Sequence, residues 1–257
     1  MNTKPLAGRT IVVTRPAEQA DALAAMIADA GGRPLRFPVI ELRDVEDERP
    51  FLAVVNRLDE FDFAVFISPN AVGRAMKRIL QRRGLPPGLR MVAVGAGSVR
   101  ALAGFGVTGV IAPQGRYDSE ALLELAELSA PRGKRLVIFR GQGGRELLGE
   151  TLSARGAQVE YAECYRRCRS DADPAPLVEA WHRNELHAVT ATSSEGLRHL
   201  FEMVGEGRDA LRNTPLFVPH PRIAQAAREL QARTVVVTGP GDAGVLTGLT
   251  AFFSAAR

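Results

Sequence analysis

The chain has 257 residues, of which 46% are hydrophobic and 24% charged. This composition is typical of a globular protein and excludes a disordered, collagen-like or coiled-coil chain. The net charge of +4 comes from 33 basic and 29 acidic residues, and only three of the basic residues are lysines. Arginine presents a planar fork of donors to carboxylates and phosphates, so the basic residues favour a small acidic ligand. Their excess is too small and too dispersed to favour nucleic acid.

The two cysteines, Cys164 and Cys168, lie four residues apart, with no further cysteine or histidine at metal-ligand spacing. They predict neither a disulfide framework nor a zinc site, and a reducing cytoplasm is the expected compartment. The N-terminus shows no apolar core of a signal peptide, and no stretch approaches the ~18 apolar residues of a membrane helix. The sequence therefore indicates a cytoplasmic protein without a membrane partner.

Short apolar strands alternate with amphipathic helices along the chain. The first strand is expected at residues 9–14, the first helix at 16–30 and an extended segment at 33–42. Later strands are expected at 63–68, 91–95, 109–113, 135–140, 187–193, 216–219 and 234–239. Helices are expected at 70–83, 119–128, 145–155, 195–204, 223–232 and 243–256. A further helix is expected to follow the strand at 91–95 and to end near Gly104. Because strands that are apolar throughout are buried on both faces, the pattern predicts an α/β protein with parallel sheets.

The two halves of the chain repeat each other. The segment GRTIVVTR (8–15) is similar to GKRLVIFR (133–140), at an offset of 125 residues. The same offset joins Gly31 to Gly156, and further matches follow in order at offsets of 124 or 125 residues. The sequence therefore predicts an internal duplication of two α/β units, each of domain size.

Small residues, hydroxyl groups and arginines gather where the strands end and the helices begin. Unpaired peptide N–H groups favour anions there, although each serine alone is explained as well by N-capping. Two lobes that face each other across a cleft would present these loops to one acidic ligand, with the extended segments 36–43 and 161–167 as crossings. The candidate binding residues are Arg15, Ser68, Asn70, Gly95, Ser98, Ser119, Arg140, Gly141, Arg145, Ser193 and Arg222.

Common catalytic and cofactor motifs are missing from the sequence. The loop Gly95-Ala96-Gly97 is followed by Arg100 where a dinucleotide motif requires glycine, and the glycines of residues 141–144 lack the end of a P-loop. The four histidines show no metal-ligand spacing, and neither a nucleophile elbow nor paired strand-end carboxylates occur. We therefore expect no metal site and no site for a dinucleotide or a nucleoside triphosphate. The remaining hydroxyl, guanidinium and phenol groups can bind, orient and protonate a ligand.

Several motifs, taken in order and spacing over essentially the whole chain, resemble the uroporphyrinogen-III synthase family. They are VVTRP (12–16), FDFAVFISPNAV (61–72), AVGAGSVRAL (93–102), YDSEALL (117–123), FRGQGGRELLGETLSARG (139–156), Tyr165 and TSS (192–194). The resemblance implies two α/β lobes with a cleft and a two-stranded connector, one lobe of residues 1–37 and 168–257 and the other of residues 38–167. It also implies an enzyme without cofactors that closes linear hydroxymethylbilane to uroporphyrinogen III, with inversion of the last pyrrole ring and loss of water.

The resemblance also implies roles for individual residues. Tyr165 matches the family's connector tyrosine and is expected to give a proton to the leaving hydroxyl group. Ser68, Ser98 and Ser193 match family hydroxyl positions, and Ser98 stands where many members carry threonine. The expected partners of the substrate carboxylates are three arginines, Arg15, Arg140 and Arg145.

The turn His220-Pro221-Arg222 departs from the family's pattern. Pro221 and the preceding Pro219 lack N–H donors that could bind an anion, and Arg222 is the expected substitute. Two other functions stay open: a non-catalytic, two-lobed binding protein for an acidic small molecule, and a nucleotide-sugar transferase. A turnover assay separates the first from the enzyme, and nucleotide protection against heating separates the second. We expect a monomer, with at most a transient contact with hydroxymethylbilane synthase.

Overall fold

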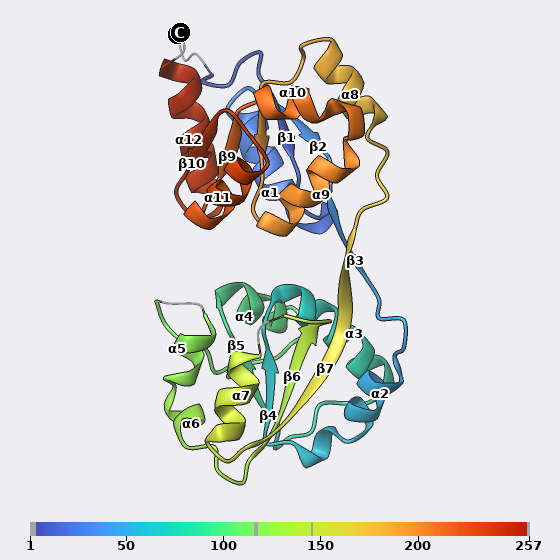
Figure 1. Cartoon of the computed structure of the whole chain (residues 1–257). Helices are drawn as coiled ribbons and strands as arrows, with labels where there is room; N and C mark the ends of the chain where they lie inside the picture. The colour runs from blue at the N-terminus through green and yellow to red at the C-terminus, as the bar shows by residue number, and fades with distance from the viewer. Residues whose placement is uncertain (1–3, 116–117, 145, 256–257) are drawn as a thin grey trace. The chain divides into compact units, whose positions relative to one another are not determined.

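The computed structural model describes residues 4–115, 118–144 and 146–255. The chain divides into unit 1, Met1–Leu42 with Cys168–Arg257, and unit 2, Arg43–Arg167. Each unit contains one five-stranded sheet with helices packed around it (Figure 1). The predicted α/β class is confirmed, with two mostly parallel sheets.

The sheet of unit 1 has the order β10-β9-β8-β1-β2 and combines strands from both ends of the chain. Its strands are β1 (Thr10–Val13), β2 (Arg33–Arg36), β8 (Ala188–Thr190), β9 (Leu216–Val218) and β10 (Val235–Val237). Neighbouring strands are parallel. All four residues of β1 are buried, as expected for a β-branched run in an interior strand of the sheet.

Helices cover both faces of this sheet (Figure 1). They are α1 (Ala17–Asp29), α8 (Ala175–His182), α9 (Ser194–Met203), α10 (Arg208–Asn213), α11 (Pro221–Glu229) and α12 (Gly241–Ala255). Val12 belongs to an apolar cluster with Leu197 of α9, whereas Ile11 and Val13 belong to a second cluster with Leu23 of α1. The alternation of β1 side chains between the two clusters follows the two-residue period of a strand.

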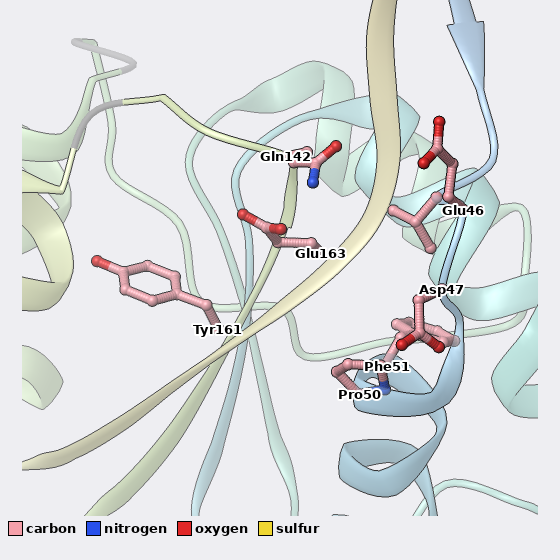
Figure 2. A pocket seen from close by; sticks show the side chains of 8 residues that line it. Glu46, Asp47, Pro50, Phe51, Gln142, Tyr161 and Glu163 are labelled. Carbon is pink, nitrogen blue, oxygen red and sulfur yellow. The ribbon is translucent and has the colours of Figure 1, made fainter.

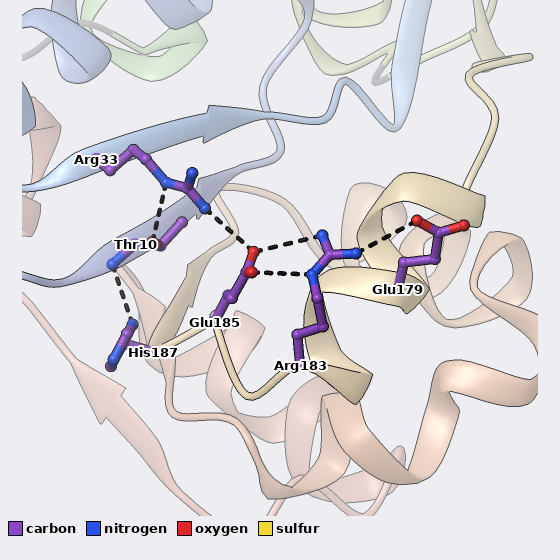
Figure 3. Close-up of polar contacts among 6 residues, drawn as sticks. All are labelled: Thr10, Arg33, Glu179, Arg183, Glu185 and His187. Carbon is purple, nitrogen blue, oxygen red and sulfur yellow. Dashed lines mark hydrogen bonds and ion pairs between the residues drawn. The ribbon is translucent and has the colours of Figure 1, made fainter.

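A polar network joins the amino ends of β1 and β8 (Figure 3). The Thr10 N–H donates to Nδ1 of His187 at 3.1 Å, and the His187 N–H donates to the Thr10 carbonyl at 3.0 Å. Arg33 donates through Nε to the Thr10 hydroxyl at 3.2 Å and pairs with Glu185 at 3.5 Å. Burial, together with the positive charges of Arg9 and Arg33, lowers the pKa of His187. The lowered pKa favours the neutral ring that its acceptor role requires.

The sheet of unit 2 has the order β3-β7-β6-β4-β5. Its strands are β3 (Ile40–Arg43), β4 (Phe63–Phe66), β5 (Arg90–Ala93), β6 (Arg135–Gly141) and β7 (Gln158–Arg169). Its helices are α2 (Arg49–Asn56), α3 (Pro69–Arg82), α4 (Ala96–Ala103), α5 (Ser119–Leu123), α6 (Ala126–Ser129) and α7 (Leu147–Ala154), and short 3₁₀ turns lie at Leu58–Glu60 and, in unit 1, at Gly205–Gly207. The strands β3 and β7 carry the chain across the boundary between the units.

The internal repeat reappears in the order of the strands. At the offset of about 125 residues, β1, β2, β4 and β5 of the first half correspond to β6, β7, β8 and β9 of the second. The order β2-β1-β8-β9 in unit 1 therefore matches β7-β6-β4-β5 in unit 2. Each sheet takes its first two strands from one half of the chain and the next two from the other half.

Three expected elements differ in the structure. The extended segment 33–42 forms two strands, β2 and β3, which belong to the sheets of different units. The strand expected at 109–113 is reduced to one bridge between Ile111 and Val92, since Gly109 has φ +67° and Pro113 cannot donate. The helix expected at 119–128 is broken at Leu125 into α5 and α6. This break lets Leu122, Leu123 and Leu128 all enter one apolar cluster.

Three short helices, α2, α8 and α10, fall in segments for which the sequence predicts no element. Each is eight residues or shorter, and two of them begin beside prolines that obscure the apolar period. None of the helices in the described part of the chain is both long and apolar enough to span a membrane.

Candidate functional site

The carboxyl ends of β4 and β5 bring two helix N-termini to one edge of the unit 2 sheet. Ser68 follows β4 and caps α3, and its hydroxyl oxygen accepts a hydrogen bond from the Ala71 N–H at 3.1 Å. Gly95 follows β5 and is the N-cap of α4. A Cβ added at Gly97 would lie 3.1 Å from the Pro69 ring, so the first turns of α3 and α4 are in contact. Unpaired N–H groups of two adjacent first turns favour an anion at this edge.

Tyr165 of β7 reaches the same edge. Its phenol oxygen lies 3.3 Å from the Ser68 hydroxyl oxygen, and the residue is 6% exposed. Its ring covers Gly141, where an added Cβ would lie 2.6 Å from Cε2 of the ring. The Gln142 N–H donates to the Tyr165 carbonyl at 2.7 Å. A hydroxyl group, a glycine and the loop after β6 therefore hold this phenol in place.

Arg140, near the end of β6, is 3% exposed, and its side chain forms hydrogen bonds with the loop that follows it. Its Nε donates to the Gly141 carbonyl at 3.2 Å, and a terminal nitrogen donates to the Gly143 carbonyl. The Gly143 N–H in turn donates to the carboxylate of Glu163 at 3.1 Å. The guanidinium lies 4.6 Å from the centre of the Tyr161 ring. Arg140 thus fixes the turn after β6 from inside the unit.

Tyr161 lines two cavities of unit 2. The first measures about 300 Å³ and has both polar and apolar walls. Its other lining residues are Ile67, Val94, Asp118, Ser119, Ile138, Arg140 and Leu148. Burial, partly offset by Arg140, raises the pKa of the Tyr161 phenol, which therefore stays a hydrogen-bond donor. Phenol, hydroxyl and guanidinium donors beside apolar side chains can bind a ring that carries acidic groups.

The second cavity measures about 420 Å³, and three carboxylates, Glu46, Asp47 and Glu163, are among the residues that line it (Figure 2). Glu46 pairs with Arg166 at 3.0 Å, Asp47 pairs with Arg49 at 2.8 Å, and Glu163 accepts the loop hydrogen bond described above. Hydrogen bonds from Arg49 lower the pKa of Asp47 to about 2. The three carboxylates therefore already have partners. Within the described ranges, no group of three His, Cys, Asp or Glu side chains is placed to hold a metal ion.

The corresponding edge of unit 1 contains an ion pair and two unpaired polar atoms. Arg15 follows β1 and pairs with Asp242 in the first turn of α12 at 2.5 Å. Ser193 caps α9 by accepting a hydrogen bond from the Gly196 N–H at 2.9 Å. The Ser194 hydroxyl oxygen and Nε of Arg15 are buried and have no partner among the described residues. This edge therefore retains hydrogen-bonding capacity, while its arginine is already neutralised.

The turn at residues 220–222 caps α11 without a hydroxyl group. Nδ1 of His220 accepts a hydrogen bond from the Arg222 N–H at 3.1 Å, and Pro221 occupies the first turn. Proline is tolerated there because its missing N–H would have no partner in the helix. The Arg222 side chain is exposed.

The structure brings together five of the predicted residues in unit 2: Ser68, Ser119, Arg140, Gly141 and Tyr165. Gly95 and Asn70 lie in the adjoining first turns of α4 and α3, while Ser98 is buried within α4. Arg15, Ser193 and Arg222 belong to unit 1. Arg145 lies outside the described residues.

The candidate residues chosen from the sequence do not include Tyr161, which lines both cavities, or Ser194, whose hydroxyl oxygen is buried without a partner among the described residues. Tyr161 shares the segment YAECYRR with Tyr165, so the signal was a second aromatic residue on an extended crossing segment. Ser194 stands beside Ser193, and the sequence cannot show which of two adjacent serines is used as the helix cap.

Comparison with known proteins finds relatives that match this chain over most of its length. The sequence profile of the family described as uroporphyrinogen-III synthase HemD matches residues 21–244. Uroporphyrinogen-III synthase of Escherichia coli K12 is 34% identical over 236 residues, which cover 91% of this chain and 96% of that protein. The Salmonella typhimurium LT2 protein of the same name is 37% identical over 238 residues, with the same two coverages.

Solved structures agree at the level of the fold. A mutant uroporphyrinogen III synthase from the extremely thermophilic bacterium Thermus thermophilus has a TM-score of 0.60 and 22% identity, covering 97% of this chain and all of that one. The Helicobacter pylori 26695 enzyme has a TM-score of 0.60 and 15% identity, with the same coverages. The profile match and the two bacterial relatives confirm the resemblance carried by the motifs, and this chain belongs to the uroporphyrinogen-III synthase family.

Proposed function

We propose that this chain catalyses the reaction of its family, the closure of hydroxymethylbilane to uroporphyrinogen III with inversion of the terminal ring and loss of water. The observation that carries this proposal is the 34–37% identity to two enzymes of that name over 91% of the chain. Nothing in the comparisons supports the alternative of a non-catalytic binding protein. The enzyme is a cyclising lyase of tetrapyrrole biosynthesis.

The reaction needs geometry more than a strong nucleophile. Protonation of the hydroxyl group lets its C–O bond break, so that water leaves and an azafulvene remains. The terminal ring attacks the azafulvene through its substituted carbon to form a spiro intermediate. This intermediate fragments and closes again with the ring reversed, so the substrate supplies every electron pair. Free bilane can close without inversion, and the enzyme must hold the chain in the geometry that inverts it.

Tyr165 is our candidate for the proton donor. A phenol is a suitable general acid for a leaving hydroxyl group when it is held in one position. The hydrogen-bond distance of 3.3 Å to Ser68, burial to 6% exposure and the close contact with Gly141 support this role. Tyr161 lines the 300 Å³ cavity, whereas Tyr165 is not among the described residues that line it. Tyr161 therefore serves as the control for Tyr165, because it is a second phenol that is not the proposed acid.

The acidic side chains of the substrate require several donors. We assign this binding to hydroxyl and peptide N–H groups at the strand ends, together with arginines. The proposed binding residues are Arg15, Ser68, Asn70, Gly95, Ser98, Ser119, Arg140, Gly141, Arg145, Ser193 and Arg222. Arg15 and Arg140 already have partners within the chain. In this proposal each guanidinium group donates charge-assisted hydrogen bonds to a substrate carboxylate in addition to the bonds that it makes with its present partner.

We also propose that the enzyme works as a cytoplasmic monomer and meets hydroxymethylbilane synthase only transiently. The two free thiols support a reducing compartment, and Cys164 is buried. The reactivity of a free bilane supports the transient contact, because the bilane must reach the enzyme before it closes unaided.

Two tyrosine variants test the mechanism. Tyr165→Phe removes only the proposed acid, and we expect kcat to fall by about 10²–10⁴-fold with little change in KM. Tyr161→Phe removes a hydroxyl group from the cavity wall, and we expect its main effect on KM. Turnover of fresh hydroxymethylbilane, with the porphyrin isomers separated, measures both. A Tyr165→Phe enzyme with unchanged kcat contradicts the proposed role.

A further inference from the structure

The pairing of β6 with β7 shifts by one residue beside the candidate site. Up to Arg140 the parallel register is regular and places Arg140 opposite Glu163. The next pair is Gly141 with Tyr165, so Cys164 has no partner in the register. An extra residue of this kind bends a strand and re-aims the side chains that follow it. The shift therefore sets the direction in which Tyr165 leaves β7.

Gly141 supplies the space into which the re-aimed ring fits. A Cβ at this position would lie 2.6 Å from Cε2, 2.7 Å from Cζ and 3.1 Å from the phenol oxygen of Tyr165. All three atoms belong to the end of the ring that carries the hydroxyl group. Any side chain at Gly141 must therefore move the phenol itself and not a remote part of the residue.

Cys164, the extra residue at the register shift, contacts both β6 and α3 through its thiol. Its thiol donates to the Arg140 carbonyl at 3.3 Å and lies 3.8 Å from the Ala71 carbonyl oxygen. Ala71 also donates its N–H to Ser68, the partner of the Tyr165 phenol. Burial raises the pKa of the Cys164 thiol to about 12, so it stays protonated and remains a donor. One thiol thus links β6, β7 and the first turn of α3.

We propose that Gly141 and Cys164 are positioning residues, which act through the register shift between β6 and β7 to hold the Tyr165 phenol against Ser68. The inference rests on the proposed role of Tyr165 as proton donor, since only then does the direction of its phenol affect turnover. Gly141, in this view, serves the tyrosine in addition to any contact that its peptide group makes with substrate.

Four variants of the full-length chain test the proposal. Cys164→Ala removes the thiol donor, Cys164→Ser replaces it with a hydroxyl donor, and Gly141→Ala fills the space under the ring. Cys168→Ala, on the same strand but without a role in the site, is the matched control. Each is assayed for kcat, KM and product isomer. Each is also labelled with 3-fluorotyrosine, so that the ¹⁹F resonance of Tyr165, identified by its loss in Tyr165→Phe, reports the surroundings of the phenol.

We expect Cys164→Ala to lower kcat by about tenfold with KM changed less than about twofold, and to shift the ¹⁹F resonance of Tyr165. Cys164→Ser is expected to restore both, Gly141→Ala to exceed both effects, and Cys168→Ala to change neither. Wild-type kcat in Cys164→Ala, or a lower kcat with an unmoved resonance, overturns the proposal. If Tyr165→Phe keeps full activity, the donor role fails while the ¹⁹F shifts still decide whether Gly141 and Cys164 position the ring.

Discussion

Two hydrogen bonds meet at the hydroxyl group of Ser68. It accepts from the Ala71 N–H at 3.1 Å and lies 3.3 Å from the Tyr165 phenol oxygen. The first bond satisfies a helix N-terminus, and the second orients a side chain from a distant strand. One residue therefore contributes both to stability and to the proposed chemistry.

Substitutions of Ser68 separate these two contributions. Ser68→Ala loses the cap, and we expect it to destabilise the fold by about 1 kcal/mol and to lower kcat. Ser68→Thr keeps a hydroxyl group, so the free energy of unfolding and the activity should both stay near those of the wild type. Urea unfolding and turnover measure the two effects. A Ser68→Ala enzyme that loses the stability but keeps its kcat contradicts the link to Tyr165.

His187 makes the stability of unit 1 depend on pH. Its pKa is lowered below the ordinary 6.5 by burial and by Arg9 and Arg33, so the unfolded chain binds the proton more readily. The stabilisation is complete above pH 6.5 and is lost as the pH falls through the lowered pKa. The free energy of unfolding in urea should therefore change less between about pH 8 and about pH 5.5 in His187→Asn than in the wild type. The same substitution at exposed His182 serves as the control, and an equal reduction there would contradict the assignment.

The sequence locates the candidate site residues at strand ends but does not give their contacts. Ser68, Arg140 and Ser193 stand where the repeat and the strand pattern predict them. The contact of Ser68 with Tyr165 joins residues 97 apart and depends on β6 lying between β4 and β7. The internal bonds of Arg140 depend on the turn at Gly143, which the order of residue types does not reveal.

At the scale of elements, two helices carry glycines with opposite surroundings. Gly149 of α7 faces Tyr161 of β7, and an added Cβ would lie 2.1 Å from the phenol oxygen. Gly73 of α3 has open space around the same position. The absence of a side chain at Gly149 therefore sets how closely α7 packs on β7, while at Gly73 it serves no packing purpose.

The two glycines predict opposite changes in stability. Gly73→Ala should stabilise the fold by about 0.5–1 kcal/mol through helix propensity. Gly149→Ala should destabilise it by about 1–3 kcal/mol, because the clash with Tyr161 exceeds the gain in propensity. Thermal and urea unfolding compare the variants. Adding Tyr161→Phe to Gly149→Ala should recover part of the loss, and no recovery would mean that a different contact limits the packing.

Strand and helix positions follow from the sequence where the apolar period is strong. β1, β6 and α3 are examples, since each has a continuous buried run or a clear helical stripe. The breaks at Pro38 and Leu125 were harder to predict, because they depend on which sheet or cluster the next residues join. Short helices such as α8 and α10 offer too few turns for a period to be recognised.

At the scale of the whole molecule, each sheet combines strands from both halves of the chain. As a result, one unit is continuous in sequence and the other is not. Unit 2 is one continuous segment, while unit 1 needs both the first 42 residues and the last 90. The strand β1 lies between β8 and β2 in the unit 1 sheet, so the C-terminal segment alone lacks a strand from within its sheet.

Fragments of the chain test this inequality. A fragment of residues 40–169 contains all five strands of the unit 2 sheet, and we expect it to unfold cooperatively in urea. A fragment of residues 168–257 leaves β8 without its neighbour β1 and should lack a cooperative transition. Circular dichroism follows both fragments, and adding residues 1–42 in trans should restore structure to the second. Cooperative unfolding of residues 168–257 alone would contradict the account.

The most direct test of the central claim is the identity of the product. Fresh hydroxymethylbilane is supplied to the wild-type protein, and the oxidised porphyrins are separated by isomer beside a protein-free control. We predict mostly the type III isomer, formed faster than the bilane closes unaided. Only type I, at the rate of the protein-free control, would contradict the assignment of this chain as a ring-inverting enzyme.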